Sequence, residues 1–199
     1  MSKDLIREFI NTIEKQEDKK YLISTIAYST APTIAGEKPS SLVVFKNREI
    51  RNLYKYWELY KEEIREQIPL EFYELKHNEN MVAVLFYNSE ELKKILKEDK
   101  NISFLQRFGY IEEMSLKESL NLLSQRYENV CPHEIGIFLG YPVDDVLEFT
   151  DCPNKQCLIM GYWKVYHDME KAKDTFKRYD NAKVKIINLL IQDLNPFRV

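Results

Sequence analysis

The chain has 199 residues, which is enough for one domain with a sizeable hydrophobic core. Its 29 basic and 32 acidic residues leave a net charge of −3, so it lacks the basic surface that attracts nucleic acid or an anionic membrane. The longest apolar run, Met81–Tyr87, is far shorter than the roughly 20 residues of a membrane-spanning helix. We predict a soluble protein with no nucleic-acid partner and no membrane partner.

The first part of the chain predicts two helical regions and a loop. Apolar residues at helical spacing behind Ser2 predict a helix over about 3–18. Residues 21–28 are mostly apolar and fit either helix or strand, with helix favoured. Residues 29–41 contain two prolines, one glycine and several hydroxyl side chains, so they form the longest predicted loop.

The next part of the chain predicts a sheet. A short buried strand over 42–45 precedes a helix over 48–68, for which Asn47 is the predicted N-cap. Residues 72–76 alternate in polarity and residues 81–87 are continuously apolar, with polar turn residues between them. This pattern predicts a β-hairpin whose second strand is buried on both faces.

Several short helices are predicted after the hairpin. One starts near Ser89, and another starts at a capping box formed by Ser115 and Glu118. Two more begin at Pro132 and Pro142, because proline suits the first position of a helix.

The end of the chain completes the predicted fold. Residues 157–165 are predicted as one strand, and Asp168 is expected to cap a long final helix. Strands separated by helices, together with one hairpin, predict an α+β fold. We expect a small mixed β-sheet with a β-hairpin, covered by several helices, in a single globular domain over 1–199.

Unusual residues are concentrated between Cys131 and Tyr166. This segment holds three of the five glycines, three of the seven prolines and all three cysteines. A chain with few glycines uses them where the backbone needs a positive φ or a close approach, so we expect a tightly specified geometry here. No spacing within the segment matches a known catalytic or ligand-binding motif.

Cysteine content and the amino terminus bear on the cellular compartment. Three cysteines cannot all pair within one chain, and a chain of this size does not need disulfides for stability. The amino-terminal residues scatter charges through an amphipathic pattern, unlike the basic and then apolar segments of a signal peptide. These features predict reduced thiols and a cytoplasmic protein.

Several strings in the sequence resemble one protein family. They are APTIAGEKPSSL at 31–42, FGY at 108–110, PHEIGIFLGYPVDDVLEF at 132–149 and GYWKVY at 161–166. They are similar to a family of uncharacterised, mainly clostridial proteins, the domain-of-unknown-function family numbered 3793. The resemblance implies a single soluble cytoplasmic domain and brings no activity or cofactor with it. It marks these distinctive positions: Lys38, His133, Glu134, Gly136, Gly140, Tyr141, Pro142, Gly161, Trp163, Lys164 and Tyr166.

A zinc site is one alternative for the cysteine-containing segment. Its four candidate ligands are Cys131, His133, Cys152 and Cys157. Their spacing lacks the close Cys-x-x-Cys pairs of zinc ribbons and knuckles. The family pattern also usually has phenylalanine at the position of Cys131. Buried or half-buried free thiols are therefore the favoured interpretation.

A DNA-binding helix-turn-helix is a second alternative, because EIGIFLGYPVDDV reads as two helices joined by a short turn. A recognition helix needs hydrogen-bond donors to phosphates and bases near its amino end. This one instead offers Asp144 and Asp145, which repel phosphate. DNA recognition is therefore the weaker interpretation.

The favoured functional prediction is a non-catalytic domain that binds a small molecule or a protein partner. Its site is expected where residues 29–41, the helix start at 133–134 and the strand at 161–166 converge. The predicted ligand-binding residues are Lys38, His133, Glu134, Tyr141, Trp163, Lys164 and Tyr166, with no metal.

An enzyme is the alternative to a binding domain. It would use an acid/base site around His133 and Glu134, with Lys38 or Lys164 as an electrophilic or anion-holding group. The sequence leaves the cofactor, the ligand and the partner unidentified.

Overall fold

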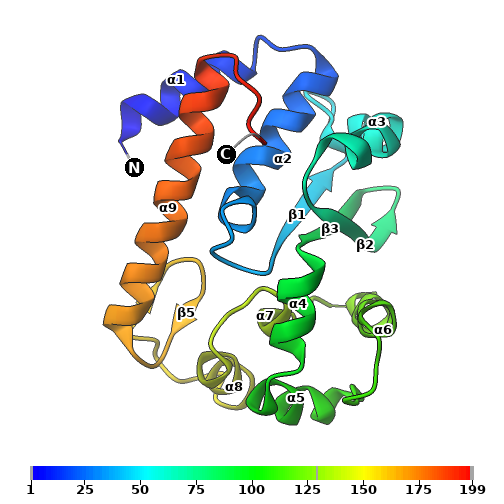
Figure 1. The fold of residues 1–199 in the computed structure, drawn as a ribbon, viewed down its shortest axis with the longest axis vertical. Helices are drawn as coiled ribbons and strands as arrows, with labels where there is room; N and C mark the ends of the chain where they lie inside the picture. The colour runs from blue at the N-terminus through cyan, green and yellow to red at the C-terminus, as the bar shows by residue number, and fades with distance from the viewer. Residues whose placement is uncertain (1, 129, 198–199) are drawn as a thin grey trace.

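A computed structural model describes residues 2–128 and 130–197 (Figure 1). It confirms the α+β fold class, with helices on both faces of a small sheet and a separate short hairpin. The helices and strands are α1 (Lys3–Ile13), α2 (Asp18–Ile34), β1 (Ser40–Lys46), α3 (Leu53–Gln67), β2 (Glu71–Asn78), β3 (Met81–Tyr87), α4 (Ser89–Leu96), α5 (Asp99–Leu105), α6 (Leu116–Tyr127), α7 (Ile135–Phe138), α8 (Val143–Asp151), β4 (Ile159–Met160), β5 (Lys164–Val165) and α9 (Met169–Ile191).

The main sheet is antiparallel rather than mixed. Its strand order is β1-β3-β2, and β3 runs antiparallel to both neighbours. The connection through α3 makes β1 and β2 run in the same direction, but β3 lies between them. A mixed sheet would need β1 and β2 to pair directly, but β3 separates them. The expectation of a mixed sheet was therefore wrong.

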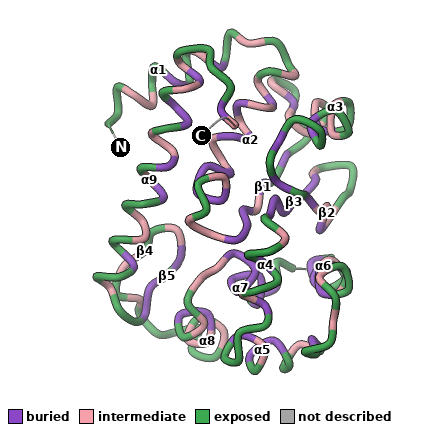
Figure 2. Tube along the Cα trace, viewed as in Figure 1, coloured by how far each residue is buried: buried purple, intermediate pink, exposed green. Residues whose placement is uncertain are grey.

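The central strand β3 is buried on both faces, which confirms the predicted hairpin. Val82, Val84 and Phe86 pack into a core cluster with α2 and α3. The alternate residues Ala83 and Leu85 pack into a second cluster with α4, α6 and α7. Because successive side chains of a strand point to opposite faces, one apolar run contributes to both cores. Figure 2 shows the resulting continuous burial along β3.

The long helix α9 joins two parts of the molecule (Figure 1). Along its carboxyl-terminal half, Ile186 and Leu190 pack with α1 and α2. Along its amino-terminal half, Ala172 and Tyr179 pack against the β4-β5 hairpin. The helix continues without a break through the polar residues Asp180 and Asn181, because Ala182 and Ile186 extend its buried stripe.

The predicted loop over 29–41 was wrong in its first half. Residues 29–34 form the last turns of α2, and Pro32 lies inside that helix. The hydroxyl of Thr30 donates to the carbonyl of Ile26 at 2.8 Å, so its polar atom is satisfied within the helix. Ala31 is buried against α1 and α9, and the Thr33 hydroxyl lies 2.8 Å from that of Ser41 on β1. This burial outweighs the loop-like composition.

Helix boundaries also differ from the prediction. The first helix ends at Ile13, well before residue 18. The helix α3 begins at Leu53, and its N-cap is Asn52 rather than the predicted Asn47. The side-chain oxygen of Asn52 accepts a hydrogen bond from the backbone amide of Lys55 in the first turn, at 3.0 Å. Ile50, which lies within the helix predicted over 48–68, precedes α3 and is 82% exposed.

The predicted strand over 157–165 is a tight hairpin instead. Only Ile159–Met160 and Lys164–Val165 pair, and the chain reverses between them. A Cβ at Gly161 would lie 2.2 Å from the ring of Phe176, so the turn depends on the absence of a side chain there. The sequence suggested such a close approach, but it did not predict the reversal.

Candidate functional site

A cavity of about 390 Å³ lies between α7, α8 and the strand β5. Its size falls within the range of small-molecule pockets, roughly 300 to 1,000 Å³. Most of its surface is apolar, and its polar groups are few. The lining residues are Cys131, Pro132, His133, Ile135, Gly136, Tyr141, Asp145, Val146, Phe149, Trp163 and Lys164.

Two stacked aromatic rings form one wall of this cavity. The rings of Tyr141 and Trp163 lie 5.1 Å apart with an interplanar angle of 28°. The Trp163 ring also meets Phe176 of α9 edge-on, at 4.6 Å. Such pairs stabilise a fixed geometry beyond the area they bury, so the wall is held in place from both sides.

The carboxylate of Asp145 holds the hairpin against α8. Its Oδ2 accepts a hydrogen bond from the indole Nε1 of Trp163 at 2.7 Å. Its Oδ1 accepts from the backbone amides of Tyr166 at 2.8 Å and His167 at 2.9 Å. Asp145 is 3% exposed, and these bonds replace the water that it loses on burial. The position of Trp163 in the cavity wall therefore depends on this carboxylate.

Polar side chains lie beside the aromatic ring of Phe149. The ring of His133 lies 4.9 Å from the ring of Phe149. The ammonium of Lys164 lies 5.1 Å from the centre of the same ring. His133 and Lys164 are both exposed, so their charged or polar ends face water at the edge of an apolar cavity.

Four of the seven predicted site residues line this one cavity: His133, Tyr141, Trp163 and Lys164. Glu134 is not among its lining residues, because its side chain is fully buried and forms an ion pair with Arg126 on α6. Tyr166 is buried beside Asp145 and contributes its backbone amide to that carboxylate.

Lys38 occupies a neighbouring cavity. Its ammonium lies 5.3 Å from the ring centre of Tyr141, and Tyr141 lines both cavities. The loop that carries Lys38 is held here because Pro39 packs on Gly140, where an added Cβ would meet Pro39 Cδ at 2.5 Å. Gly140 also has a φ of 74°, which glycine adopts without strain.

The thiol at the edge of the cavity is not activated. Burial raises the pKa of the Cys131 thiol, whereas a reactive cysteine needs a lowered pKa. All three cysteines are free. This geometry gives no support to a cysteine nucleophile at Cys131.

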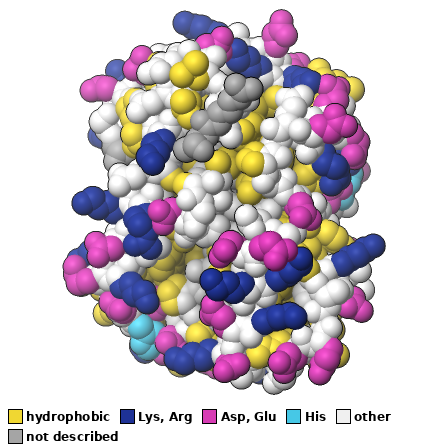
Figure 3. All heavy atoms as spheres, in the orientation of Figure 1, with side chains coloured by type: hydrophobic (Ala, Val, Ile, Leu, Met, Phe, Trp, Pro, Cys, Tyr) yellow, Lys and Arg dark blue, Asp and Glu magenta, His cyan; other side chains and the backbone are white. Residues whose placement is uncertain are grey.

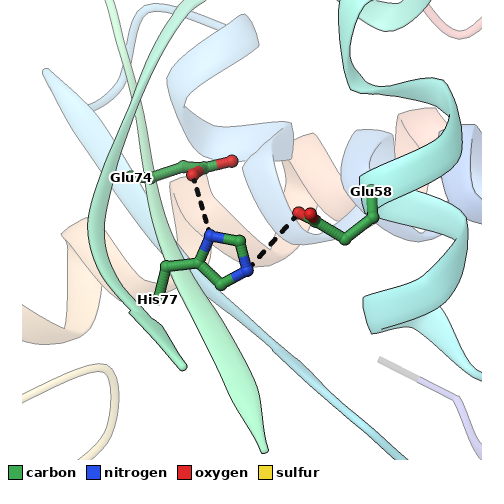
Figure 4. Close-up of side chains that lie close together, drawn as sticks. All are labelled: Glu58, Glu74 and His77. Carbon is green, nitrogen blue, oxygen red and sulfur yellow. Dashed lines mark ion pairs between the residues drawn. The ribbon is translucent and has the colours of Figure 1, made fainter. Parts of the chain in front are cut away.

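The four residues considered as zinc ligands do not form a close group. Among residues 2–128 and 130–197, one set of His, Cys, Asp or Glu side chains brings three potential ligand atoms within 4.8 Å of one another. It consists of Glu58, Glu74 and His77 (Figure 4). This set lies between α3 and β2, on elements that do not line the cavity.

The Glu58, Glu74 and His77 set is part of an ion-pair network. The imidazole of His77 lies 3.7 Å from Glu58 and 3.5 Å from Glu74 (Figure 4). The ammonium of Lys61 lies 3.2 Å from Glu58 and 2.9 Å from Glu74. The indole of Trp57 also donates to Glu74 at 2.7 Å. Because a cation would displace Lys61 from both carboxylates, we interpret the set as a structural link between α3 and β2.

Sequence reasoning missed the three cavity residues on α8, which are Asp145, Val146 and Phe149. Asp145 and Phe149 are four residues apart, so they lie on one face of this helix with Val146 beside them. That spacing was available from the sequence. The sequence did not show that this face of α8 would meet the hairpin, because that contact is tertiary.

The sequence profile of DUF3793, a family described as proteins of unknown function, matches residues 26–199. The chain belongs to this family. The match covers every element that lines the cavity and confirms the resemblance seen in the sequence. No curated protein and no solved structure matches the chain. In the described part of this DUF3793 protein, no helix has the length and apolar character needed to cross a bilayer.

Proposed function

We propose that this protein binds a small molecule with a flat apolar body and one anionic group in the cavity between α7, α8 and β5. The observation that carries the proposal is the cavity itself, about 390 Å³ in volume and lined mainly by apolar and aromatic side chains. Such cavities, with a few well-placed polar groups, are the usual form of small-molecule sites.

The walls support a flat apolar ligand. The Trp163 indole and the Tyr141 ring form one wall, and the exposed ring of Phe149 contributes another surface. An aromatic or conjugated ligand gains both burial and offset stacking from such surfaces. The Trp163 N–H already donates to Asp145, so the indole presents its ring rather than a hydrogen-bond donor.

The polar edge supports an anionic group. Lys164 and His133 both lie against Phe149 at the cavity. Lys164 forms no ion pair within 4.0 Å among the residues described. The buried acid of the site, Asp145, has its oxygens satisfied by Trp163 and two backbone amides. The lysine is therefore the charged group that remains for a ligand.

The enzyme alternative has less support from the geometry. It would use His133 or Glu134 as the proton carrier, but Glu134 points into the core and pairs with Arg126, which leaves only His133 of the two at the cavity. A proton carrier must reach the substrate within hydrogen-bond distance or through one water. Binding, rather than acid/base chemistry with Glu134, is the function that we propose.

Two further aspects of the proposal concern partners and compartment. Basic and acidic side chains are interspersed on the face shown in Figure 3, which supports a small-molecule role over nucleic-acid binding.

The three free cysteines support a reducing, cytoplasmic environment. Fractionation of the native host, followed by immunodetection, tests the compartment.

The first test uses an anionic aromatic dye, 8-anilinonaphthalene-1-sulfonate, as the probe. We expect saturable binding with increased dye fluorescence. Cys131→Trp should weaken it at least tenfold, because the larger side chain fills the cavity. The matched control is Cys152→Trp, since Cys152 is also an exposed cysteine but lies outside the cavity.

A second pair of variants tests the anionic group. Lys164→Met should weaken binding of the sulfonated dye several-fold, and Lys155→Met should leave it unchanged, because Lys155 pairs with Glu148 outside the cavity. Equal dye affinity in the Cys131→Trp and Cys152→Trp variants would remove the cavity as the site. Native mass spectrometry before and after denaturation then identifies any ligand retained from the host.

A further inference from the structure

A second cavity, about 280 Å³ in volume, lies on the other side of Tyr141. It is bounded by the carboxyl end of α2, the start of β1, the loop after α7 and the middle of α9. Lys38 and Lys183 are both partly exposed and can be reached from solvent. The lining residues are Ser29, Pro32, Lys38, Ser41, Leu42, Leu139, Tyr141, Tyr162 and Lys183.

The two ammonium groups in this cavity rest on tyrosine rings. Lys38 lies 5.3 Å from the ring centre of Tyr141 and 5.7 Å from that of Tyr179. Lys183 lies 4.7 Å from the ring centre of Tyr162, and it also lies over Tyr28. Contacts of this kind stabilise an ammonium, but they offset only part of the cost of burying it.

The acidic groups around this cavity already have other partners. Glu37, next to Lys38, forms an ion pair with Arg178 at 2.8 Å. Asp180 on α9 accepts a hydrogen bond from Tyr162 at 2.8 Å. Neither cavity lysine lies within 4.0 Å of a carboxylate in the part of the chain that the structure describes. Two positive charges therefore share one cavity with no carboxylate in direct contact, although the charge of Asp180 is felt at Lys183.

The titration of these lysines agrees with this imbalance. Burial, together with the nearby charge of Lys183, lowers the pKa of Lys38 to about 8. Burial also lowers the pKa of Lys183, although the charge of Asp180 opposes the change. Both shifts mean that the surroundings stabilise the charged amines less than water does.

We propose that this second cavity is a binding site for a compact oxyanion, such as a carboxylate or phosphate group, held between the ammonium groups of Lys38 and Lys183. An anion here supplies the missing counter-charge, and lysine ammoniums are strong donors to such oxygens. Ser29 also lines the cavity, and its hydroxyl can donate a further hydrogen bond.

Anion binding at this site should take up protons. At pH 8 about half of Lys38 is neutral, because its pKa is about 8. An anion favours the charged amine, so binding should draw about half a proton per anion at that pH and fewer at pH 7. Calorimetry in buffers with different ionisation enthalpies measures this uptake.

The experiment is isothermal titration calorimetry of the whole chain with inorganic phosphate and, separately, with acetate. Saturable binding of either anion, with proton uptake at pH 8, supports the proposal and shows which oxyanion fits better. Lys38→Met and Lys183→Met should each weaken binding at least tenfold. The control is Lys164→Met, which alters the other cavity and should leave the affinity within a factor of two.

A charge-retaining variant separates loss of binding from loss of folding. Lys38→Arg keeps the positive charge, so it should bind within about tenfold of the wild type if it folds, as circular dichroism can verify. The proposal is overturned if neither anion binds saturably, or if Lys38→Met binds as tightly as Lys164→Met. Dye binding in the first cavity is measured independently, so either proposal can fail alone.

Discussion

The carboxylate of Asp145 gives the sharpest test of how this site is built. It accepts three hydrogen bonds, from the Trp163 indole and from two backbone amides, at 2.7, 2.8 and 2.9 Å. Asp145→Asn keeps the size and shape of the side chain. Its amide oxygen can still accept from the two backbone amides, but its NH₂ group then faces the N–H of Trp163, donor against donor.

The magnitudes follow from these contacts. Asp145→Asn loses one bond to a charged acceptor and gains a donor-donor contact, so we expect a loss of about 2 kcal/mol in the free energy of unfolding. Asp145→Ala leaves three buried donors unpaired, and we expect a loss of about 4 kcal/mol. Replacing Trp163 by Phe in the Asp145→Asn protein removes the opposing donor, so the two substitutions should be less than additive.

Urea unfolding followed by circular dichroism measures these free energies, with the two single variants and the double variant forming a thermodynamic cycle. The matched control is Asp144→Asn, because Asp144 precedes Asp145 on α8 but is exposed. A loss below about 0.5 kcal/mol for Asp145→Asn would refute the reasoning, since even one neutral hydrogen bond contributes about that much. Strict additivity in the cycle would equally show that the two side chains do not interact.

Three other substitutions have defined expectations. The buried hydroxyl of Tyr110 has no hydrogen-bond partner within residues 2–128 and 130–197. Tyr110→Phe should therefore raise the free energy of unfolding in urea by up to about 1 kcal/mol. A loss of that size would show that the hydroxyl is hydrogen-bonded. Gly161→Ala drives a methyl group into the Phe176 ring, so we expect a loss of about 2 kcal/mol in the free energy of unfolding. The loss should be smaller when Phe176 is also replaced by Leu. An equal loss in both backgrounds would show that the Phe176 ring is not its cause. The pKa of Lys38 falls from 10.5 to about 8 on folding, so the unfolded chain binds that proton more tightly. The free energy of unfolding should therefore rise between pH 8 and pH 10.5. Lys38→Met should flatten this rise, and an unchanged dependence on pH contradicts the lowered pKa of Lys38.

The sequence predicted the parts of the fold that depend on local pattern. The apolar run of β3, its turn and the capping box of Ser115 and Glu118 are all present in the structure. In each of these, a short range of residues carries the whole signal: a continuous apolar run, a polar turn or a reciprocal pair of side-chain bonds. The α+β class followed from the order of these elements.

Predictions failed where tertiary packing outweighs composition. The end of α2 contains serine, threonine and proline, yet it is helical because its buried side chains pack against α1, α9 and β1. The segment ending at Val165 is apolar enough for one strand, but the chain reverses at Gly161, where the ring of Phe176 on α9 leaves no room for a side chain. No local pattern contains the position of α9, so neither outcome could be predicted from the sequence alone.

The candidate site was predicted in part, and the reason lies in what its residues do. The concentration of special residues led to His133, Tyr141, Trp163 and Lys164, which the structure places around one cavity. Glu134 looked equally distinctive, but its role is an internal ion pair with Arg126. A sequence shows that a position is unusual, whereas only the fold shows whether the side chain points to a cavity or to the core.

The two cavities have a common structural origin. The hydroxyl of Ser40 donates to the carbonyl of Phe138 at 2.7 Å, and Pro39 packs directly on Gly140. These contacts fix the loop that carries Lys38 against the turn between α7 and α8, although the two segments are about 100 residues apart in the chain. This turn also positions the Tyr141 ring. The ring stacks on Trp163 and contacts the ammonium of Lys38. Tyr141 thus lines both cavities, and the packing of Pro39 on Gly140 holds the turn that carries it. This explains why residues that carry no reactive chemistry are among the most distinctive of the sequence.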